Sequence, residues 1–170
     1  MKDKKIHKIV NAVFSLEVSK GHLRWKVSDL ARIAGMNRSL IYYYLGKTKS
    51  QIFESCLKLV ADEFFGLTDE RIQMVRDGRI LECVYLSRQM FVDHPDFMVF
   101  YLKWRLKKSP VQQKLIDIEE SYRKKLQGIF TKSSKEEILA FHALLHGLVS
   151  CPFIGTETFK KALSMMKALD

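Results

Sequence analysis

The sequence predicts an all-α protein of two parts, and three features of its 170 residues lead to that fold class. Apolar residues recur three or four positions apart through most of the chain, which is the period of an amphipathic helix. Capping residues, glycines and prolines separate these stretches from one another. No run of strictly alternating apolar and polar residues is bounded by hairpin-turn residues, so strands are not expected.

The first helix is expected over residues 3–20. Its apolar face consists of Ile6, Ile9, Val10, Val13 and Phe14. Gly21 ends this helix as a C-terminal cap. A short second helix over residues 28–34 begins at Ser28 as its N-cap, and Gly35 then turns the chain into a third helix capped by Asn37.

A capping box at Thr48 and Gln51 begins a longer fourth helix, which carries apolar residues through Phe65. Beyond Gly66, helix breaks or caps occur at Asp77-Gly78, His94-Pro95, Ser109-Pro110 and Ser134. The expected helices cover residues 68–76, 79–93, 96–107, 110–130, 135–151 and 156–169.

Composition removes several classes of protein. Cys56, Cys83 and Cys151 are odd in number and form no C-x-x-C pair, which argues against a zinc ribbon or a secreted disulfide framework. The start of the chain has no signal-peptide pattern, and no apolar run of about 20 residues occurs, so we expect a cytoplasmic protein without membrane contact. No phosphate loop, nucleophile elbow or catalytic carboxylate pair appears, so neither an enzyme nor a cofactor is expected.

Positive charge is concentrated near the start of the chain. Residues 1–49 hold eleven Lys or Arg against three acidic residues, whereas residues 50–170 hold 18 against 16. A basic module joined to a nearly neutral remainder is typical of a protein whose first part meets a polyanion. Nucleic acid, an acidic membrane surface and a merely solvated basic face all fit the charge alone.

The segment "VSDLARIAGMNRSLIYYYL", residues 27–45, has the pattern of a helix-turn-helix. Leu30, Ala34 and Ile41 supply apolar contacts, and Gly35 allows the tight turn. The remaining positions of the third helix point outward near its N-terminus, where a recognition helix meets base edges. They are Arg38, Ser39, Tyr42 and Tyr43. In the alternative interpretation, all three tyrosines (Tyr42, Tyr43 and Tyr44) pack the third helix onto its neighbours.

With "IVNAVFSLEVSKG" ahead of it, residues 6–53 resemble the DNA-binding domain of the tetracycline-repressor (TetR) family of bacterial transcription regulators. The shared pattern joins a helix ending in Gly, a D-L-A-x-x-A-G-M segment, a tyrosine-rich run and a Lys-bearing helix start. The chain departs from the family at Trp25 and Lys26, where Ser or Thr is frequent, at Leu40, and at Thr48. Lys26 can replace a hydroxyl contact to phosphate.

The resemblance implies a helix-turn-helix DNA-binding domain over residues 1–49 and a helical domain for effector binding and dimerisation over residues 50–170. It also implies a homodimer on a pseudo-palindromic double-stranded DNA operator, acting as a repressor that a small ligand releases; the aromatic and methionine-rich residues 85–104 suit an apolar or aromatic ligand. The alternative is a DNA binder of the same fold that is controlled by a protein partner or acts architecturally; a helical adaptor unrelated to DNA is a further rival. The candidate DNA-binding residues are Lys26, Ser28, Asn37, Arg38, Ser39, Tyr42, Tyr43, Lys47, Thr48 and Lys49.

An aromatic and methionine-rich set follows in the second part. As candidates for lining a ligand pocket we take Tyr85, Met90, Phe91, His94, Phe97, Tyr101, Trp104, Tyr122 and His142. Pockets are mostly apolar with a few polar groups that fix the ligand, but ordinary core has the same residue types.

His142 and His146 stand four apart, which is a metal-ligand spacing. The stretch "HALLH" lacks the glutamate of zinc peptidases, and packing or a dimer face explains the pair without a metal. Small and apolar residues around them suit a two-helix hairpin at a dimer interface, with a monomer's own core as the alternative. The candidate interface residues are Ala140, Ala143, Leu144, Gly147, Leu148, Phe159, Leu163 and Met166.

Overall fold

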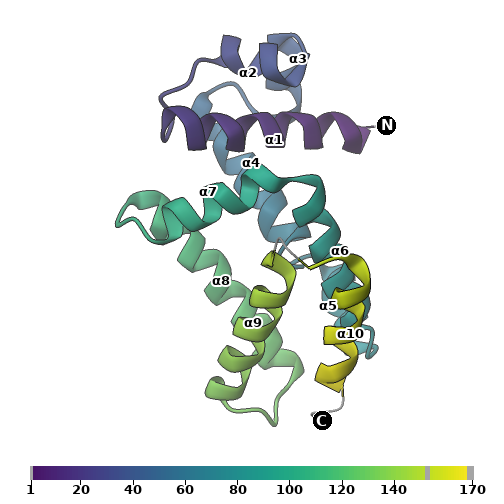
Figure 1. Ribbon diagram of the computed structural model, residues 1–170. Coiled ribbons are helices and arrows are strands. Elements are labelled where there is room, and N and C mark those ends of the chain that lie inside the picture. Colours follow the sequence, from purple (N-terminus) through teal and green to yellow (C-terminus); the bar gives the residue numbers. More distant parts are fainter. Residues whose placement is uncertain (1, 152–153, 168–170) are drawn as a thin grey trace.

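The computed structural model describes residues 2–151 and 154–167, which form ten α-helices and no strand (Figure 1). The helices are α1 (Lys2–Lys20), α2 (Val27–Ala34), α3 (Arg38–Leu45), α4 (Lys49–Glu63), α5 (Asp69–Arg76), α6 (Ile80–Asp93), α7 (Pro95–Arg105), α8 (Pro110–Ile129), α9 (Lys135–Ser150) and α10 (Thr156–Lys167). The prediction of an all-α fold is confirmed.

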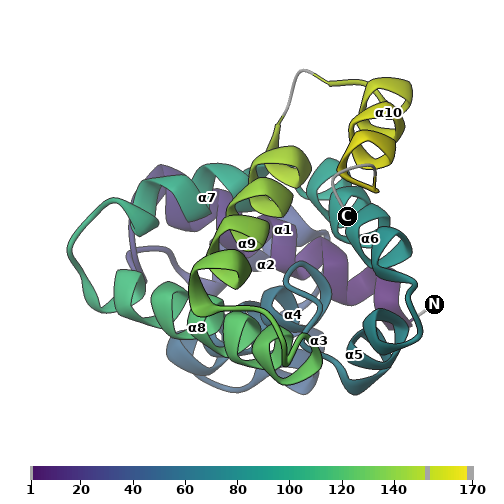
Figure 2. The same cartoon turned by 90° about the horizontal axis from the view of Figure 1, so that it is seen from below.

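The helix-turn-helix lies at one end of the molecule. Helices α2 and α3 sit above α1, and α4 leads from them into the body formed by α5 to α10 (Figure 1). α1 lies across α7, while α9 packs against α6 and α8 (Figures 1 and 2). The division of the chain at residue 49 stays a prediction.

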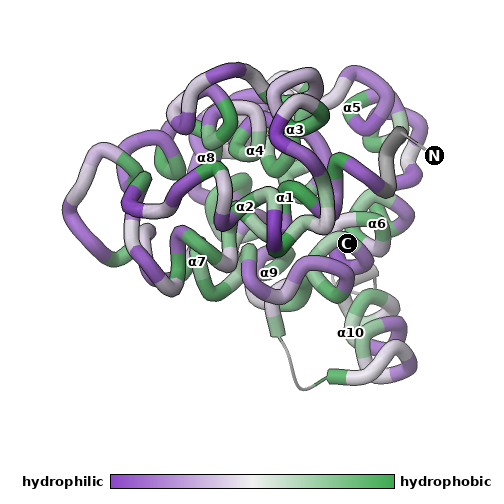
Figure 3. Tube along the Cα trace, turned by 90° about the horizontal axis from the view of Figure 1, so that it is seen from above, coloured by the Kyte–Doolittle hydropathy of each residue, from purple (hydrophilic) through white to green (hydrophobic). Residues whose placement is uncertain are grey.

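One apolar core runs from α1 into the body. The Phe14 ring on α1 lies 5.3 Å from that of Phe97 and 4.8 Å from that of Phe100, both on α7. All three side chains are fully buried. Hydrophilic and hydrophobic residues alternate along the helices (Figure 3), as expected for helices with one buried face. In the part of the chain that the structure describes, no helix is long and apolar enough to cross a membrane.

Local capping explains where several helices begin. The side chains of Asn37, Thr48, Ser109 and Ser134 each accept a hydrogen bond from a backbone N–H in the first turn of the helix that follows. The prediction that Ser28 caps α2 is wrong, because α2 begins one residue earlier. The Asp29 carboxylate, in the first turn of α2, instead accepts a hydrogen bond from the backbone N–H of Lys26 at 3.1 Å and so stabilises the start of that helix.

Candidate nucleic-acid interface

The outer face of α3 is set by the turn that precedes it. Gly35 adopts φ +63°, a left-handed conformation that few other residues tolerate. The side-chain oxygen of Asn37 then accepts from the backbone N–H of Leu40 at 2.8 Å, which starts α3. Ile41 and Leu45 are buried against the core, so the opposite side of α3 faces solvent.

That opposite side carries Arg38, Ser39 and Tyr43, all exposed, and the Tyr43 side chain is 77% exposed. Tyr42 was predicted to point outward as well, but it is half-buried and packs against the core. The reason is helical geometry, because Tyr42 lies only about 60° around α3 from buried Leu45. Tyr43 lies nearly opposite Ile41.

Basic residues flank this face without an opposing free carboxylate. Lys26 before α2 and Lys47 before α4 are exposed, and Ser28 is half-buried. Asp29 is the one acidic residue between positions 21 and 53. Its carboxylate accepts from the Lys20 ammonium at 2.7 Å, a contact that holds the pKa of Asp29 below its usual value. The face therefore presents uncompensated positive charge.

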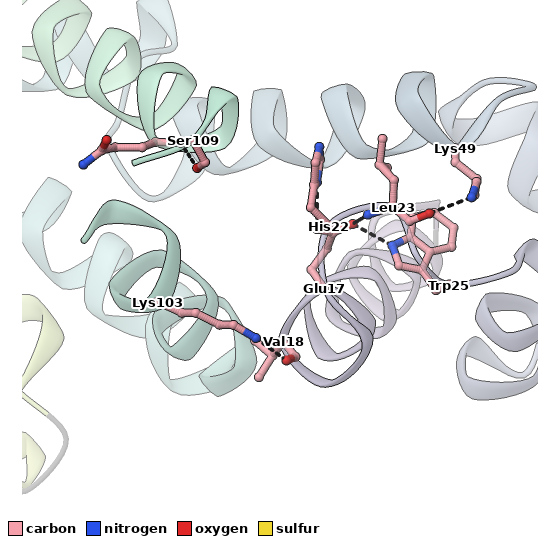
Figure 4. A network of polar contacts seen from close by, with 9 residues as sticks. Glu17, Val18, His22, Leu23, Trp25, Lys49, Lys103 and Ser109 are labelled. Atoms are coloured by element: carbon pink, nitrogen blue, oxygen red, sulfur yellow. Dashed lines mark hydrogen bonds and ion pairs between the residues drawn. The ribbon is translucent and has the colours of Figure 1, made fainter. Parts of the chain in front are cut away.

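Three predicted DNA contacts have structural roles in the free chain. Asn37 and Thr48 use their side-chain oxygens to cap α3 and α4. The Lys49 ammonium donates to the backbone carbonyl of Leu23 at 2.6 Å (Figure 4). All three remain exposed, but their side chains also maintain the shape of the helix-turn-helix.

A buried carboxylate beneath the helix-turn-helix was not predicted from the sequence. Glu17 on α1 is 0% exposed and accepts hydrogen bonds from Trp25 Nε1 at 2.6 Å and from the Leu23 backbone N–H at 3.0 Å (Figure 4). The His22 Nδ1 lies 2.9 Å from its second oxygen. Burying a charge is costly unless it is hydrogen-bonded, and these contacts supply that compensation. One feature of the sequence could have indicated this burial. Glu17 follows Val13 by four residues and Phe14 by three, which places it on the apolar face of α1.

Helix α7 contacts both the end of α1 and the loop between α1 and α2. The Lys103 ammonium donates to the Val18 carbonyl at 2.6 Å (Figure 4). The His22 ring lies 4.7 Å from the Phe53 ring of α4 and 5.9 Å from the Trp104 ring of α7. The loop that leads into α2 is thus held by both α4 and α7.

A small apolar cavity of about 50 Å³ lies among α4, α5, α6, α8 and α9. Tyr122 and His142 are the only predicted pocket residues that line it. Met90, Phe91, Phe97 and Trp104 are buried in the core and do not line this cavity. Three other predicted pocket residues also lie away from this cavity. Tyr85 is 42% exposed, the buried His94 ring stacks on His7, and Tyr101 lines a different, open groove.

That groove, of about 890 Å³, runs between α8 and α9. At its base, the Glu119 carboxylate is buried and accepts from Tyr101 Oη at 2.6 Å and Arg105 Nε at 2.7 Å. Burial alone would raise the pKa of Glu119, but these hydrogen bonds bring it below its usual value. Arg123 Nη1 lies 3.6 Å from the other Glu119 oxygen and 3.3 Å from His142 Nδ1.

Burial, together with His146 and Arg123 nearby, lowers the pKa of His142 to about 4. The pKa of His146 is lowered as well, mainly by burial. Both rings are therefore neutral near pH 7. Within the described residues, no third His, Cys, Asp or Glu joins them in a group that could hold a metal ion.

The predicted dimer face is divided between two environments. On α9, Ala140, Ala143, Leu144 and Gly147 are exposed and Leu148 is half-buried. On α10, Phe159 and Leu163 are buried in the chain's own core, as in the alternative interpretation, and the Met166 side chain lies outside the described residues.

The position of α10 explains the burial of Phe159. Helix α10 lies beside α6 (Figure 2), and the Phe159 ring lies 6.5 Å from the Tyr85 ring on α6. The Arg88 guanidinium, also on α6, donates to the carbonyls of Val149, Cys151 and Ile154 and lies 5.8 Å from the Phe159 ring. These bonds hold the connection between α9 and α10 against α6.

No family model and no curated protein matches the sequence. Among solved structures, the chain is similar to the crystal structure of an HlyIIR mutant protein in which one segment is substituted by a linker containing two thrombin sites. The match covers 98% of this chain and 91% of that chain, with a TM-score of 0.55 and 16% sequence identity. HlyIIR is a regulator of the TetR family. The chain has a TetR-like helical fold.

Proposed function

We propose that this protein is a sequence-specific DNA-binding transcriptional regulator that acts as a homodimer on a pseudo-palindromic operator. The observation that carries the proposal is the exposed face of α3, where Arg38, Ser39 and Tyr43 stand together between Lys26 and Lys47. Fold likeness to a TetR-family regulator supports the same function.

Each residue on this face has a distinct role in the proposal. The Arg38 guanidinium donates two hydrogen bonds to a guanine edge in the major groove. Ser39 contacts a base or a phosphate, and the hydroxyls of Tyr43 and Tyr42 bond phosphate oxygens. Lys26 and Lys47 neutralise phosphates and position α3 without reading sequence. Two copies of α3 in a dimer read half-sites separated by about 34 to 36 Å, one turn of DNA, or a multiple of this.

In this proposal the regulator is a repressor, and a small ligand in the body releases it from DNA. The cavity beside Tyr122 and His142 supports that role. Its volume of about 50 Å³ is well below the roughly 300 to 1,000 Å³ of typical ligand pockets. This small size favours, as the second candidate, a regulator of the same fold that responds to a protein partner or acts architecturally.

Selection of genomic DNA fragments by the purified protein at about physiological salt tests the proposal. We expect a recovered palindrome whose binding weakens steeply with added salt, because phosphate contacts release counterions. Recovery of fragments without a shared sequence would leave only architectural DNA binding, and absence of binding would contradict the proposal. Once a palindrome is known, its promoter indicates the regulated gene.

A further inference from the structure

Two histidines separate the cavity from the groove. His142 and His146 line both the cavity among α4, α5, α6, α8 and α9 and the open groove between α8 and α9. Among the residues that the structure describes, no others line both spaces. The two imidazoles therefore lie between an apolar interior and an open groove.

Both histidines carry an unsatisfied polar atom. The Nε2 atoms of His142 and His146 are buried and have no hydrogen-bond partner. The His142 side chain as a whole is also buried, with 7% of its surface exposed. Buried polar groups in proteins are nearly always paired, so an unpaired one calls for an explanation such as an absent ligand or water. Here two such atoms lie four residues apart on the same wall.

The neighbour of His142 determines which kind of partner its Nε2 needs. Arg123 Nη1 lies 3.3 Å from His142 Nδ1, and a guanidinium can only donate. His142 Nδ1 must therefore accept, so the single proton of the neutral ring resides on Nε2. The unsatisfied Nε2–H requires an acceptor, such as a carbonyl or carboxylate oxygen.

The charges on the groove side favour an anionic acceptor. Arg105, Arg123, Lys124 and Lys135 line the groove against Glu119 and Glu120. Glu119 is already paired with Arg105 and Arg123. On the cavity side the lining is mainly apolar, with Phe65, Val84, Tyr122 and Leu145 among its residues.

From this arrangement we infer that the effector is a small organic acid, with one apolar ring or short branched chain in the cavity and its carboxylate at the two imidazoles. The carboxylate accepts from His142 Nε2–H, and the Arg123 guanidinium beside Nδ1 holds the ring in the tautomer that donates from Nε2. The apolar part of the effector contacts Phe65 and Leu145. Entry of the effector moves the two imidazoles and enlarges the cavity toward the groove. This inference rests on the proposed function, in which a small ligand controls DNA binding.

Benzoate and ethylbenzene are suitable probes, because they are similar in size and only benzoate carries the carboxylate. Calorimetric titration of the full chain is expected to show benzoate binding at least tenfold more tightly than ethylbenzene. His142→Phe, which removes the donor, and Arg123→Met, which removes the guanidinium, are each expected to weaken benzoate binding at least tenfold. Lys132→Met, which removes a charge from an exposed residue outside both spaces, is the matched control and is expected to bind benzoate like the wild type.

Equal binding of the two probes, or benzoate binding that both variants leave unchanged, would overturn the inference. The comparison of probes on the wild-type chain decides the matter even if a variant fails to fold. Operator binding is measured on the same preparations. If the chain binds its operator but neither probe, the organic-acid inference fails and the DNA-binding function stands. If it binds benzoate through His142 but no operator, the proposed function fails instead.

Discussion

At the scale of single residues, the structure separates two tyrosines that the sequence treats alike. Tyr43 is 77% exposed on the outer face of α3, whereas Tyr42 is half-buried beside Leu45. Tyr43→Phe is expected to weaken operator binding by about 0.5 to 1.5 kcal/mol, the usual contribution of one hydrogen bond, and Tyr42→Phe by less. Fluorescence anisotropy with labelled operator measures both, with Tyr44→Phe as the control. Unchanged affinity in both variants would show that neither hydroxyl contacts DNA.

The buried Glu17 makes a second residue-level prediction. Glu17→Ala leaves the N–H groups of Trp25 and Leu23 without their acceptor, and each such loss costs about 1 to 3 kcal/mol. Urea denaturation is expected to show a large loss in the free energy of unfolding, with Glu17→Gln less affected because its amide oxygen still accepts. Glu136→Ala, at an exposed position of α9, is the control. Equal stability of Glu17→Ala and the control would contradict the assigned role.

Protonation of His142 links stability to pH. Its pKa is 6.5 in ordinary surroundings and about 4 in the folded chain, so the unfolded chain binds more protons between these values. The free energy of unfolding is therefore expected to fall as pH drops from about 6.5 to about 4, by up to roughly 3 kcal/mol from this residue. Denaturation of the wild type and His142→Gln at several pH values isolates the effect. The same slope in both proteins above pH 4.5 would contradict it.

At the scale of elements, sequence patterns predicted helices and their starts well, because both depend on local interactions. Asn37, Thr48 and Ser134 cap their helices through backbone groups three residues away. The start of α2 differs because the Asp29 carboxylate takes the capping role assigned to Ser28. Periodicity shows that α10 has an apolar face but not what covers it, so the burial of Phe159 on α6 could not be predicted.

The position of the cavity could not be predicted from the sequence either. Residues 85–104 are rich in aromatic residues, and sequence spacing cannot distinguish a cavity wall from a filled core. The packing of α7 on α1 buries Phe97 and Phe100, whereas the cavity forms farther along, where α8 and α9 meet α6. These contacts join residues that are far apart in the sequence, so local sequence patterns do not reveal them.

The turn between α3 and α4 makes a prediction at this scale. Gly46 has φ +111°, and a Cβ there would lie 2.7 Å from Gln51 Cβ. Gln51 Oε1 accepts from the backbone N–H groups of Lys47 and Thr48, so displacing it disturbs the start of α4. Gly46→Ala is expected to lower the melting temperature and to destabilise the chain by about 1 to 3 kcal/mol.

Gly128→Ala is the matched control for Gly46→Ala. Gly128 lies within α8 with nothing within 4 Å of an added Cβ, so alanine is expected to stabilise the helix by up to about 1 kcal/mol. Destabilisation by both substitutions, or by neither, would contradict the account of the turn.

At the scale of the whole molecule, positive charge is concentrated at one end of the chain, whereas the apolar core extends through both parts. Most of the excess of basic residues lies in the first 49 residues, yet the apolar core and the contacts of His22 and Lys103 join that end to α7. A change in the body can therefore reach the loop before α2 through α7 as well as through α4. This continuity suits a regulator whose DNA-binding face responds to events elsewhere in the chain.

Arg38→Ala is the sharpest test of whether the exposed face of α3 reads DNA sequence. The measurement is the ratio of affinities for the selected palindrome and a scrambled duplex at one salt concentration, with Arg76→Ala, at an exposed position of α5, as the control. Arg38→Ala is expected to lower affinity for the palindrome by about 1 to 3 kcal/mol and to leave nonspecific binding much less affected. An unchanged ratio in Arg38→Ala would show that α3 does not read sequence through this residue, contrary to the proposed function.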